Sequence, residues 1–201
     1  RRNTRWIQCI FHIYSDWRTR PGYKAVNFAA ALLQRFSLWL ARHADGVVNI
    51  NSEVRDALIG RGFDASKIAI IMPGIDLDYI AAIPPGNDQD AYDAVFLGRL
   101  NPSKGIFDLP PIWKKVTERL PLARLAIIGG GSENITVKLN AELEAYNLHD
   151  NVDLLGYVET EKIYAILKRA RIFVFPSHEE GFGIAIVEAM ACGTPVVAWN
   201  L

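Results

Sequence analysis

The sequence predicts an α/β protein made of two doubly wound units, in which strands and helices alternate along the chain. Short apolar runs of strand length alternate with segments of helical periodicity, most regularly over residues 94–199. A stretch of prolines, a glycine and acids at residues 84–90 separates two such series and is typical of a domain boundary. Residues 1–86 hold 11 basic and 7 acidic side chains, whereas residues 87–201 hold 11 and 15. This unequal charge also favours two units.

The elements of the first unit follow from its apolar periodicity. Arg5 to Ile13 is an apolar run that predicts a strand, and a polar, turn-rich stretch follows it. Apolar residues then recur at helical spacing from Ala25 to Ala44, without Gly or Pro, so one long helix is expected. Residues 46–50 and 67–74 predict two further strands. Between them Ser52 is expected to cap a short helix.

The second unit alternates strand and helix and ends on a fifth strand. Its strands are predicted at residues 94–100, 125–129, 152–158, 172–176 and 195–199, and its helices at residues up to 120, 134–148, 160–170 and 184–192. Pro110 and Pro111 would break a helix interior, so the regular part of the first helix is expected to begin there.

The resulting domain prediction assigns residues 1–83 to the first domain, 84–91 to a linker and 92–201 to the second domain. The chain begins with Arg1 rather than Met and ends at Leu201, directly after a predicted strand. We therefore expect a fragment in which both domains are incomplete.

Composition excludes several classes of protein. The 22 Lys and Arg balance 22 Asp and Glu, which argues against a nucleic-acid binder with its usual basic excess. Only two cysteines are present, so a reducing, cytoplasmic compartment is expected and both cysteines are interpreted as core residues. No uncharged stretch approaches the roughly 18 residues of a membrane-spanning helix, and no signal peptide is visible.

Three post-strand loops of the second unit offer binding groups, because ligands of such sheets gather at the carboxyl ends of the strands. Arg99 and Lys104 flank a turn and can face one anion, although two unrelated solvated charges fit the pattern equally well. The glycines at 129–131 imitate a dinucleotide fingerprint, which fails where Asn134 replaces its third glycine, so a tight turn is favoured. Backbone groups near Val158 can contact a nucleobase, but nothing in the sequence requires this.

The fourth loop is the most informative. Glu180 precedes the glycines at 181 and 183, which allow close approach of a ligand to the backbone. The helix predicted from Ile184 offers free N–H groups and a positive dipole end to a phosphate. Glu188 is an isolated carboxylate in an otherwise apolar helix, so it lies at a cleft or is paired with a cation.

The string EGFGIAIVE, residues 180–188, resembles the E-x7-E motif of retaining glycosyltransferases of the family 4 (group 1) type. FLGRLNPSKGIFDL, NVDLLGYV, RIFVFPS and, upstream, SKIAIIMPGIDLDYI are similar to the same family in order and spacing. The resemblance covers the whole second unit and, more loosely, residues 5–80. It implies a GT-B architecture of two Rossmann-like domains, with acceptor bound mainly by the first and sugar-nucleotide donor by the second.

The resemblance also implies a retaining hexosyltransferase and the roles of its site residues. Arg99 and Lys104 would hold the donor diphosphate, Glu180 the transferred sugar and Glu188 the ribose. The site residues are then Glu180 and His12 as catalytic, and Arg99, Lys104, Gly181, Phe182, Gly183, Ile184, Glu188 and Val158 as donor-binding. No metal and no cofactor beyond the sugar nucleotide are implied, and none of the four histidines has metal-ligand spacing.

Some interpretations remain open at this point. His12 ends a predicted strand where relatives place a cleft histidine, but a structural histidine fits the bare sequence. A sugar-nucleotide binding module without transfer activity is one alternative function, and an NAD-dependent oxidoreductase is another. The helix at 25–44 is expected to be buried on its sheet, or else to lie on a membrane beside a lipid-linked rather than a free carbohydrate acceptor. The isolated fragment is expected to be inactive.

Overall fold

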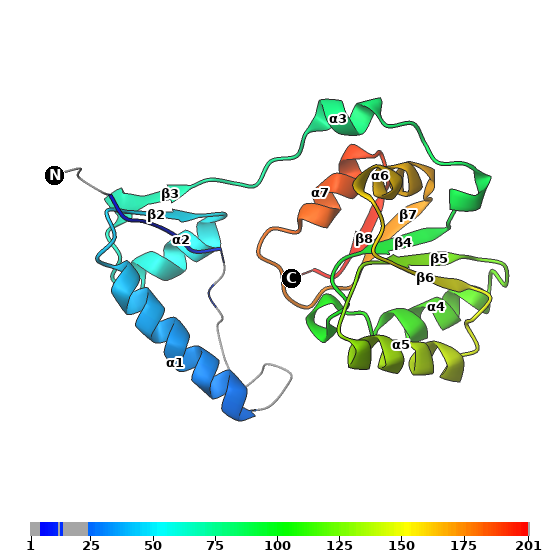
Figure 1. The fold of residues 1–201 in the computed structure, drawn as a ribbon, viewed down its shortest axis with the longest axis horizontal. Coiled ribbons are helices and arrows are strands. Elements are labelled where there is room, and N and C mark those ends of the chain that lie inside the picture. Colours follow the sequence, from blue (N-terminus) through cyan, green and yellow to red (C-terminus); the bar gives the residue numbers. More distant parts are fainter. Residues whose placement is uncertain (1–4, 12, 14–23, 201) are drawn as a thin grey trace. The chain divides into compact units, whose positions relative to one another are not determined.

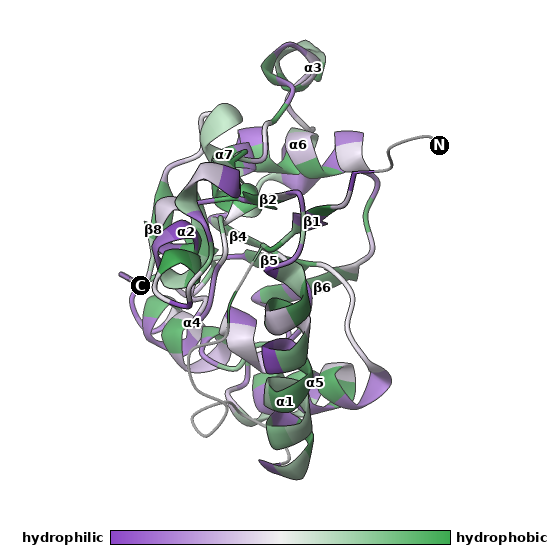
Figure 2. Cartoon of the chain, turned by 90° about the vertical axis from the view of Figure 1, so that its left-hand side faces the viewer, coloured by the Kyte–Doolittle hydropathy of each residue, from purple (hydrophilic) through white to green (hydrophobic). Residues whose placement is uncertain are grey.

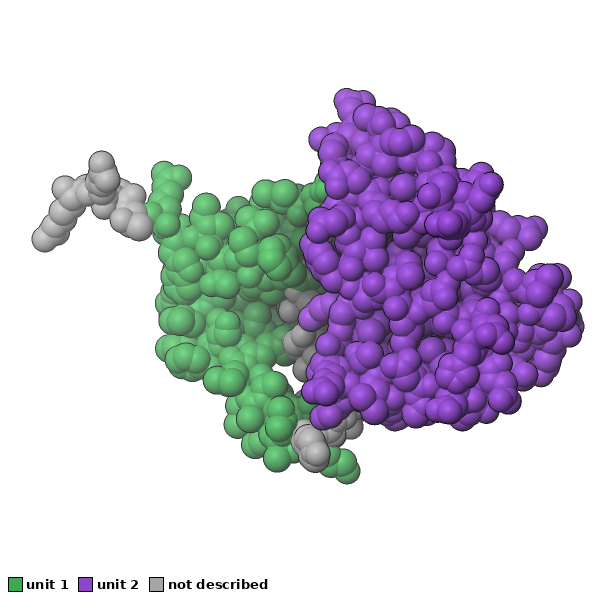
Figure 3. Space-filling view, turned by 45° about the vertical axis from the view of Figure 1, so that its right-hand side comes forward, with its two compact units in different colours: residues 1–74 green, residues 75–201 purple. Residues whose placement is uncertain are grey.

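The computed structural model describes residues 5–11, 13 and 24–200, and the chain divides into two compact units, Arg1–Gly74 and Ile75–Leu201 (Figure 3). Each unit contains its own sheet, and every strand pair in both sheets is parallel. The predicted α/β class is therefore confirmed.

The first unit has a sheet in the order β1-β2-β3. Its elements are β1 (Ile7–Cys9), α1 (Lys24–Ala41), β2 (Gly46–Asn49), α2 (Ser52–Ile59), the 3-10 helix η1 (Ala65–Lys67) and β3 (Ile68–Ile70). A small core joins them, formed by Ile10, Ala41, Val47, Val54, Leu58 and Phe63. The strands are shorter than the apolar runs that predicted them.

Two local predictions in the first unit are corrected. The cap of α2 is Asn51 rather than Ser52, since the Asn51 side chain accepts a hydrogen bond of 2.8 Å from the backbone N–H of Val54. Cys9 is exposed rather than buried in the core, while Cys192 of the second unit is half-buried. The sheet of the first unit has β1 at its edge, which explains why an apolar strand residue there remains accessible.

The helix α1 packs on its unit through the side that includes Leu38 and Ala41. Its larger apolar side chains lie exposed on the other side; they are Val26, Phe28, Leu32, Leu33, Phe36, Trp39 and Leu40, with Leu33 69% exposed. In Figure 2 the helix is largely green, the colour of hydrophobic residues. The expectation that this side is buried against the sheet is therefore wrong for the chain described.

The second unit has a sheet in the order β6-β5-β4-β7-β8. Its strands are β4 (Ala94–Leu97), β5 (Leu125–Ile128), β6 (Val152–Gly156), β7 (Ile172–Phe175) and β8 (Val196–Ala198). Its helices are α3 (Leu77–Ala82), α4 (Leu109–Thr117), α5 (Glu133–Ala145), α6 (Thr160–Arg169) and α7 (Ile184–Ala191), with 3-10 turns η2 (Asp88–Asp90) and η3 (Pro102–Lys104). The helices α4 and α5 cover one face of the sheet, and α6 and α7 cover the other (Figure 1).

The core of this unit is fixed by its central strands. Ala94, Val95 and Phe96 of β4 and all four residues of β5 are buried, as expected for a sheet covered on both faces. The prolines Pro110 and Pro111 lie in the first turn of α4, as the sequence predicts, where a missing N–H costs no hydrogen bond.

The boundary between the units lies at Gly74, earlier than the predicted end at residue 83. The reason is that α3 packs on the second unit, where Ile80 and Ile83 join the core. The Lys168 ammonium on α6 donates hydrogen bonds to the carbonyls of Ile80 (2.6 Å) and Ala81 (3.3 Å).

The segment predicted as a linker is likewise an ordered part of the second unit. The backbone N–H of Gly86 donates to the carbonyl of Ala165 on α6, at 2.9 Å. Asn87 and Asp90 form a capping box around η2, and Asp90 pairs with Lys162 of α6. The prolines, glycine and acids at 84–90 thus make a capped turn on α6.

Candidate functional site

The order of strands in the second unit locates a binding crevice. The chain runs from β4 outward to β5 and β6 on one side, then returns to β7 and β8 on the other side of β4. The helices that follow β4 and β7, α4 and α7, therefore lie on opposite faces of the sheet, and the switch point between these strands is where open α/β sheets bind ligands. The loops at residues 98–105 and 176–183 follow these two strands.

The loop after β4 is shaped by a cap and a glycine. The Asn101 side chain accepts a 2.9 Å hydrogen bond from the N–H of Ser103, which starts the turn η3. Gly105 ends the turn in the left-handed conformation, at φ 69°. A Cβ at Gly105 would lie 1.7 Å from the carbonyl oxygen of Pro176, so only glycine lets the two loops meet here.

The loop after β7 is tied to the loop after β4 by hydrogen bonds. The backbone N–H of His178 donates to the carbonyl of Ser103 at 2.8 Å, and the Ser177 hydroxyl lies 3.3 Å from the same oxygen. The hydroxyl of Ser177 also donates to the carbonyl of Glu179, at 3.0 Å. The His178 ring reaches across to the N-cap residue of α4, Asp108, and its Nε2 lies 2.6 Å from the carboxylate of that residue.

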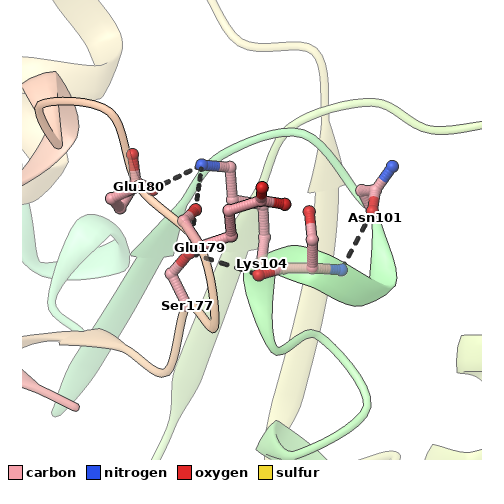
Figure 4. Close-up of polar contacts among 6 residues, drawn as sticks. Asn101, Lys104, Ser177, Glu179 and Glu180 are labelled. Carbon is pink, nitrogen blue, oxygen red and sulfur yellow. Dashed lines mark hydrogen bonds and ion pairs between the residues drawn. The ribbon is translucent and has the colours of Figure 1, made fainter. Parts of the chain in front are cut away.

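Lys104 and Glu180 meet where the two loops touch. The Lys104 ammonium forms an ion pair with Glu180 Oε1 and lies 3.3 Å from the carbonyl of Glu179 (Figure 4). It also lies 5.9 Å from the centre of the Phe175 ring. The side chains of Lys104 and Glu180 are only 19% and 18% exposed. A cation and a carboxylate that are 76 positions apart in the sequence thus form a largely buried ion pair.

Two more features of these loops suit an anion. Arg99 is exposed just beyond β4, and none of the described residues forms an ion pair with its guanidinium. Gly183 is buried and left-handed, at φ 78°, and it precedes the first turn of α7. The turn places Gly181 and Phe182 between Glu180 and this helix start, while the side chain of Ile184 is exposed. The first N–H groups of α7 have no partner within the helix and so can bind a phosphate.

Glu188 lies one turn further into α7, and it is half-buried. Its Oε1 accepts a 2.8 Å hydrogen bond from the hydroxyl of Tyr164 on α6. Burial, together with the negative charge of Glu188, raises the pKa of Tyr164 well above its ordinary value of 10, so this phenol keeps its proton. The partner of Glu188 is thus a tyrosine, and not the cation that the sequence analysis left as one possibility.

The remaining sequence-predicted positions lie at the same edge of the sheet or outside the described residues. Val158 is half-buried just after β6 and packs against the core. The glycine loop after β5 serves close packing, because a Cβ at Gly129 would meet the carbonyl oxygen of Gly98 at 1.9 Å. His12 lies outside the described residues. No group of three or more His, Cys, Asp or Glu that fits a metal ion occurs among the residues that the structure describes.

With this geometry in place, the chain can be compared with known proteins. The family model described as "Glycosyl transferases group 1" matches residues 83–201, which is more than half of the chain. The chain belongs to this glycosyltransferase family. The model described as "Glycosyltransferase Family 4" matches residues 1–79. The two matches divide the chain near the boundary between its two units.

Curated relatives of the chain carry different enzyme names. It is 35% identical over 107 residues to the D-inositol 3-phosphate glycosyltransferase of Mycobacteroides abscessus, covering 51% of this chain and 23% of the relative. It is 37% identical over 107 residues to the mannosylfructose-phosphate synthase of Agrobacterium fabrum, covering 50% and 24%. The chain thus spans about a quarter of the length of these relatives.

Solved structures confirm the fold. The Anabaena protein HepE, in complex with UDP and glucose, matches 96% of this chain and 52% of its own, with a TM-score of 0.72 and 22% identity. S. aureus TarM, in complex with UDP, alpha-GlcNAc-glycerol and Fondaparinux, matches 84% and 32%, with a TM-score of 0.68 and 25% identity. These neighbours are glycosyltransferases of the GT-B architecture, which agrees with the expectation from sequence.

Several residues that shape the site are absent from the sequence-based set. Ser177 and His178 lie just after a strand, and this position in the sequence could have predicted that they belong to a binding loop. Asp108 and Tyr164 gave no such signal, because each acts through a partner far along the chain, at His178 and Glu188. Only the fold brings these partners together.

Proposed function

We propose that this protein transfers a hexose from a nucleotide-diphosphate sugar to an acceptor hydroxyl, with retention of anomeric configuration and without a metal. The observation that supports this most directly is the meeting of Lys104 and Glu180 at the switch point between β4 and β7. A cation suited to a diphosphate lies there beside a carboxylate suited to sugar hydroxyls. Two structural neighbours, TarM and HepE, were solved in complex with UDP, and HepE also with glucose.

The proposed roles follow the geometry of the two loops. Lys104 and Arg99 bind the diphosphate, aided by the free N–H groups at the start of α7. When the diphosphate takes over Lys104, the carboxylate of Glu180 becomes free to accept hydrogen bonds from the sugar. Glu188 accepts from the ribose. The backbone of the remaining donor-binding residues completes the pocket: Val158 toward the base, and Gly181, Phe182, Gly183 and Ile184 toward the phosphates and sugar.

The chemistry that these groups support is stabilisation of a departing nucleoside diphosphate. As the bond from the sugar to the phosphate breaks, negative charge grows on the leaving oxygen. Fixed cations and helix N–H groups stabilise that charge without reorganising. Retention with attack from the same face leaves the departing phosphate itself to take the proton of the acceptor hydroxyl. The predicted cleft role of His12 needs no base function in this scheme.

A calorimetric titration of the chain with UDP, GDP and ADP, in buffer with a chelator, tests the donor site. One of the three is expected to bind, and Lys104→Ala and Glu188→Ala are each expected to weaken it about tenfold or more, since each removes a charged hydrogen bond. Lys115→Ala is the matched control, because Lys115 is an exposed lysine in the last turn of α4. Equal binding by Lys104→Ala and the natural chain would refute the assignment.

Turnover separates transfer from binding alone. The matching sugar nucleotide is incubated with a panel of carbohydrate and lipid-linked acceptors, and release of the nucleoside diphosphate is followed. Retention predicts that the anomeric proton of the product has the same configuration as in the donor, which proton NMR measures directly. Because the isolated chain is expected to be inactive, this assay uses the full-length protein, and donor binding without release there would favour a binding module instead.

We further propose that α1 mediates peripheral contact with an anionic membrane face on the cytoplasmic side. Its exposed apolar residues are accompanied by Lys24 and Arg35, and the helix contains no Asp or Glu. Such a basic, amphipathic face fits an anionic bilayer surface. No helix among the described residues is long and apolar enough to cross a membrane. Co-sedimentation with anionic but not zwitterionic vesicles at low salt is expected, and Leu33→Asp should abolish it.

A further inference from the structure

We propose that Tyr164 is a positioning residue that holds the carboxylate of Glu188 in place for the ribose hydroxyls of the donor nucleotide. The proposal rests on the function proposed above and adds a residue to its site. The hydroxyl of Tyr164 on α6 donates to Oε1 of Glu188 on α7, at 2.8 Å. The two helices pack against each other, so the contact joins neighbouring elements of one unit.

The carboxylate of Glu188 needs such a partner. It is half-buried on a helix whose other residues are all apolar, and a carboxylate withdrawn from water without a donor is costly. Among the described residues, no other side chain donates a hydrogen bond to it. Its second oxygen therefore stays available to a ligand while the first is fixed.

Tyr164 is itself held from the other side. Its side chain is buried, with the residue only 7% exposed. The ring of Tyr79 on α3 meets it edge-on, with 6.3 Å between the ring centres. The Tyr79 hydroxyl donates in turn to Glu161 Oε1 on α6, at 2.8 Å. Burial and the ring contact with Tyr79 thus hold the phenol of Tyr164 in place, and the Tyr79 hydroxyl takes no part in that contact.

A locked donor beside the carboxylate has a functional consequence. A glutamate side chain has several accessible rotamers, and a ligand that needs only one of them loses affinity by selecting it. Because Tyr164 selects a rotamer in advance, the ribose hydroxyls meet a carboxylate that is already placed. Removal of the Tyr164 hydroxyl should therefore weaken the ribose contacts and spare the phosphate contacts.

The test compares a ribonucleoside diphosphate with its 2′,3′-dideoxy form by calorimetry, using whichever of UDP, GDP and ADP the chain binds. The natural chain is expected to prefer the ribose form about tenfold, as for a charged hydrogen bond. Tyr164→Phe should weaken the ribose form about fivefold and the dideoxy form less than twofold. Tyr79→Phe is the matched control, because it removes a hydroxyl from the same aromatic pair without touching Glu188. It should leave both affinities unchanged.

Three results would overturn the proposal. One is equal weakening of both nucleotides by Tyr164→Phe, another is no weakening of either, and the third is a further loss when Tyr164→Phe is added to Glu188→Ala. If circular dichroism shows that Tyr164→Phe is not folded, 3,5-difluorotyrosine at this position keeps the ring and changes the donor strength of the hydroxyl. The ribose preference should then change more than twofold, and an unchanged preference overturns the proposal.

The outcomes also separate this proposal from the one on which it rests. If the natural chain binds none of the three diphosphates, the proposed function fails and the role of Tyr164 fails with it. If the natural chain binds one and prefers ribose, but Tyr164→Phe keeps that preference, only the role of Tyr164 is rejected.

Discussion

Replacement of Gly105 by alanine is expected to destabilise the second unit and to weaken nucleotide binding together. Gly105 has φ 69°, and alanine in this left-handed region costs about 1–2 kcal/mol. The new Cβ would also lie 1.7 Å from the carbonyl oxygen of Pro176, so the two loops must separate by more than an ångström. That separation removes the hydrogen bonds from His178 and Ser177 to the carbonyl of Ser103.

The hydrogen bond from His178 contributes about 1 kcal/mol, and Ser177 keeps its shorter bond to the Glu179 carbonyl, so the total expected loss is about 2–3 kcal/mol. The neighbouring Lys104 would move away from Glu180, and the affinity for the nucleoside diphosphate should fall as well. Urea unfolding is monitored by hydrogen-exchange mass spectrometry of peptides from β7, and this signal reports the stability of the second unit alone.

Gly130→Ala is the matched control for this prediction. Gly130 follows β5 at the same edge of the sheet, a Cβ there meets nothing within 4 Å, and its φ is not in the left-handed region. It should leave stability unchanged or raise it by about 0.4–1 kcal/mol through the unfolded state. Equal stabilities for Gly105→Ala and Gly130→Ala would refute the argument that the two loops meet through a glycine.

Three more predictions concern other parts of the molecule. Lys168→Met removes an ammonium that holds the last carbonyls of α3, and urea unfolding should show a loss of about 1–3 kcal/mol; no loss would contradict the packing of α3 on the second unit. Burial raises the pKa of Cys192 to about 11. Iodoacetamide at pH 8 should therefore label exposed Cys9 first, and labelling of Cys192 should accelerate as the pH rises toward 11. Peptide mass spectrometry measures both rates. Asn51→Ala should cost about 1 kcal/mol by loss of the α2 cap, whereas Ser52→Ala should cost less than half of that in the same urea assay.

The sequence predicted most of the fold because its periodicities are local. The alternation of strand and helix in the second unit appears in the structure, with ends shifted by a few residues. The prolines of α4 mark its first turn as expected. Tertiary contacts decided other features: residues 84–90 have the composition of a linker and are fixed to α6, and α1 packs through its smaller side chains.

The sequence by itself determined the α/β class, the family resemblance and the two loops that form the candidate site. Hydrophobic period, glycine placement and the acid spacing of Glu180 and Glu188 all lie within short stretches of chain. Only the tertiary structure decided which partners those residues have. Lys104 meets Glu180 because β4 and β7 are adjacent strands, and Tyr164 meets Glu188 because α6 and α7 pack on the same face. Such pairings depend on strand order and helix packing, which join residues from distant parts of the chain and leave no local pattern.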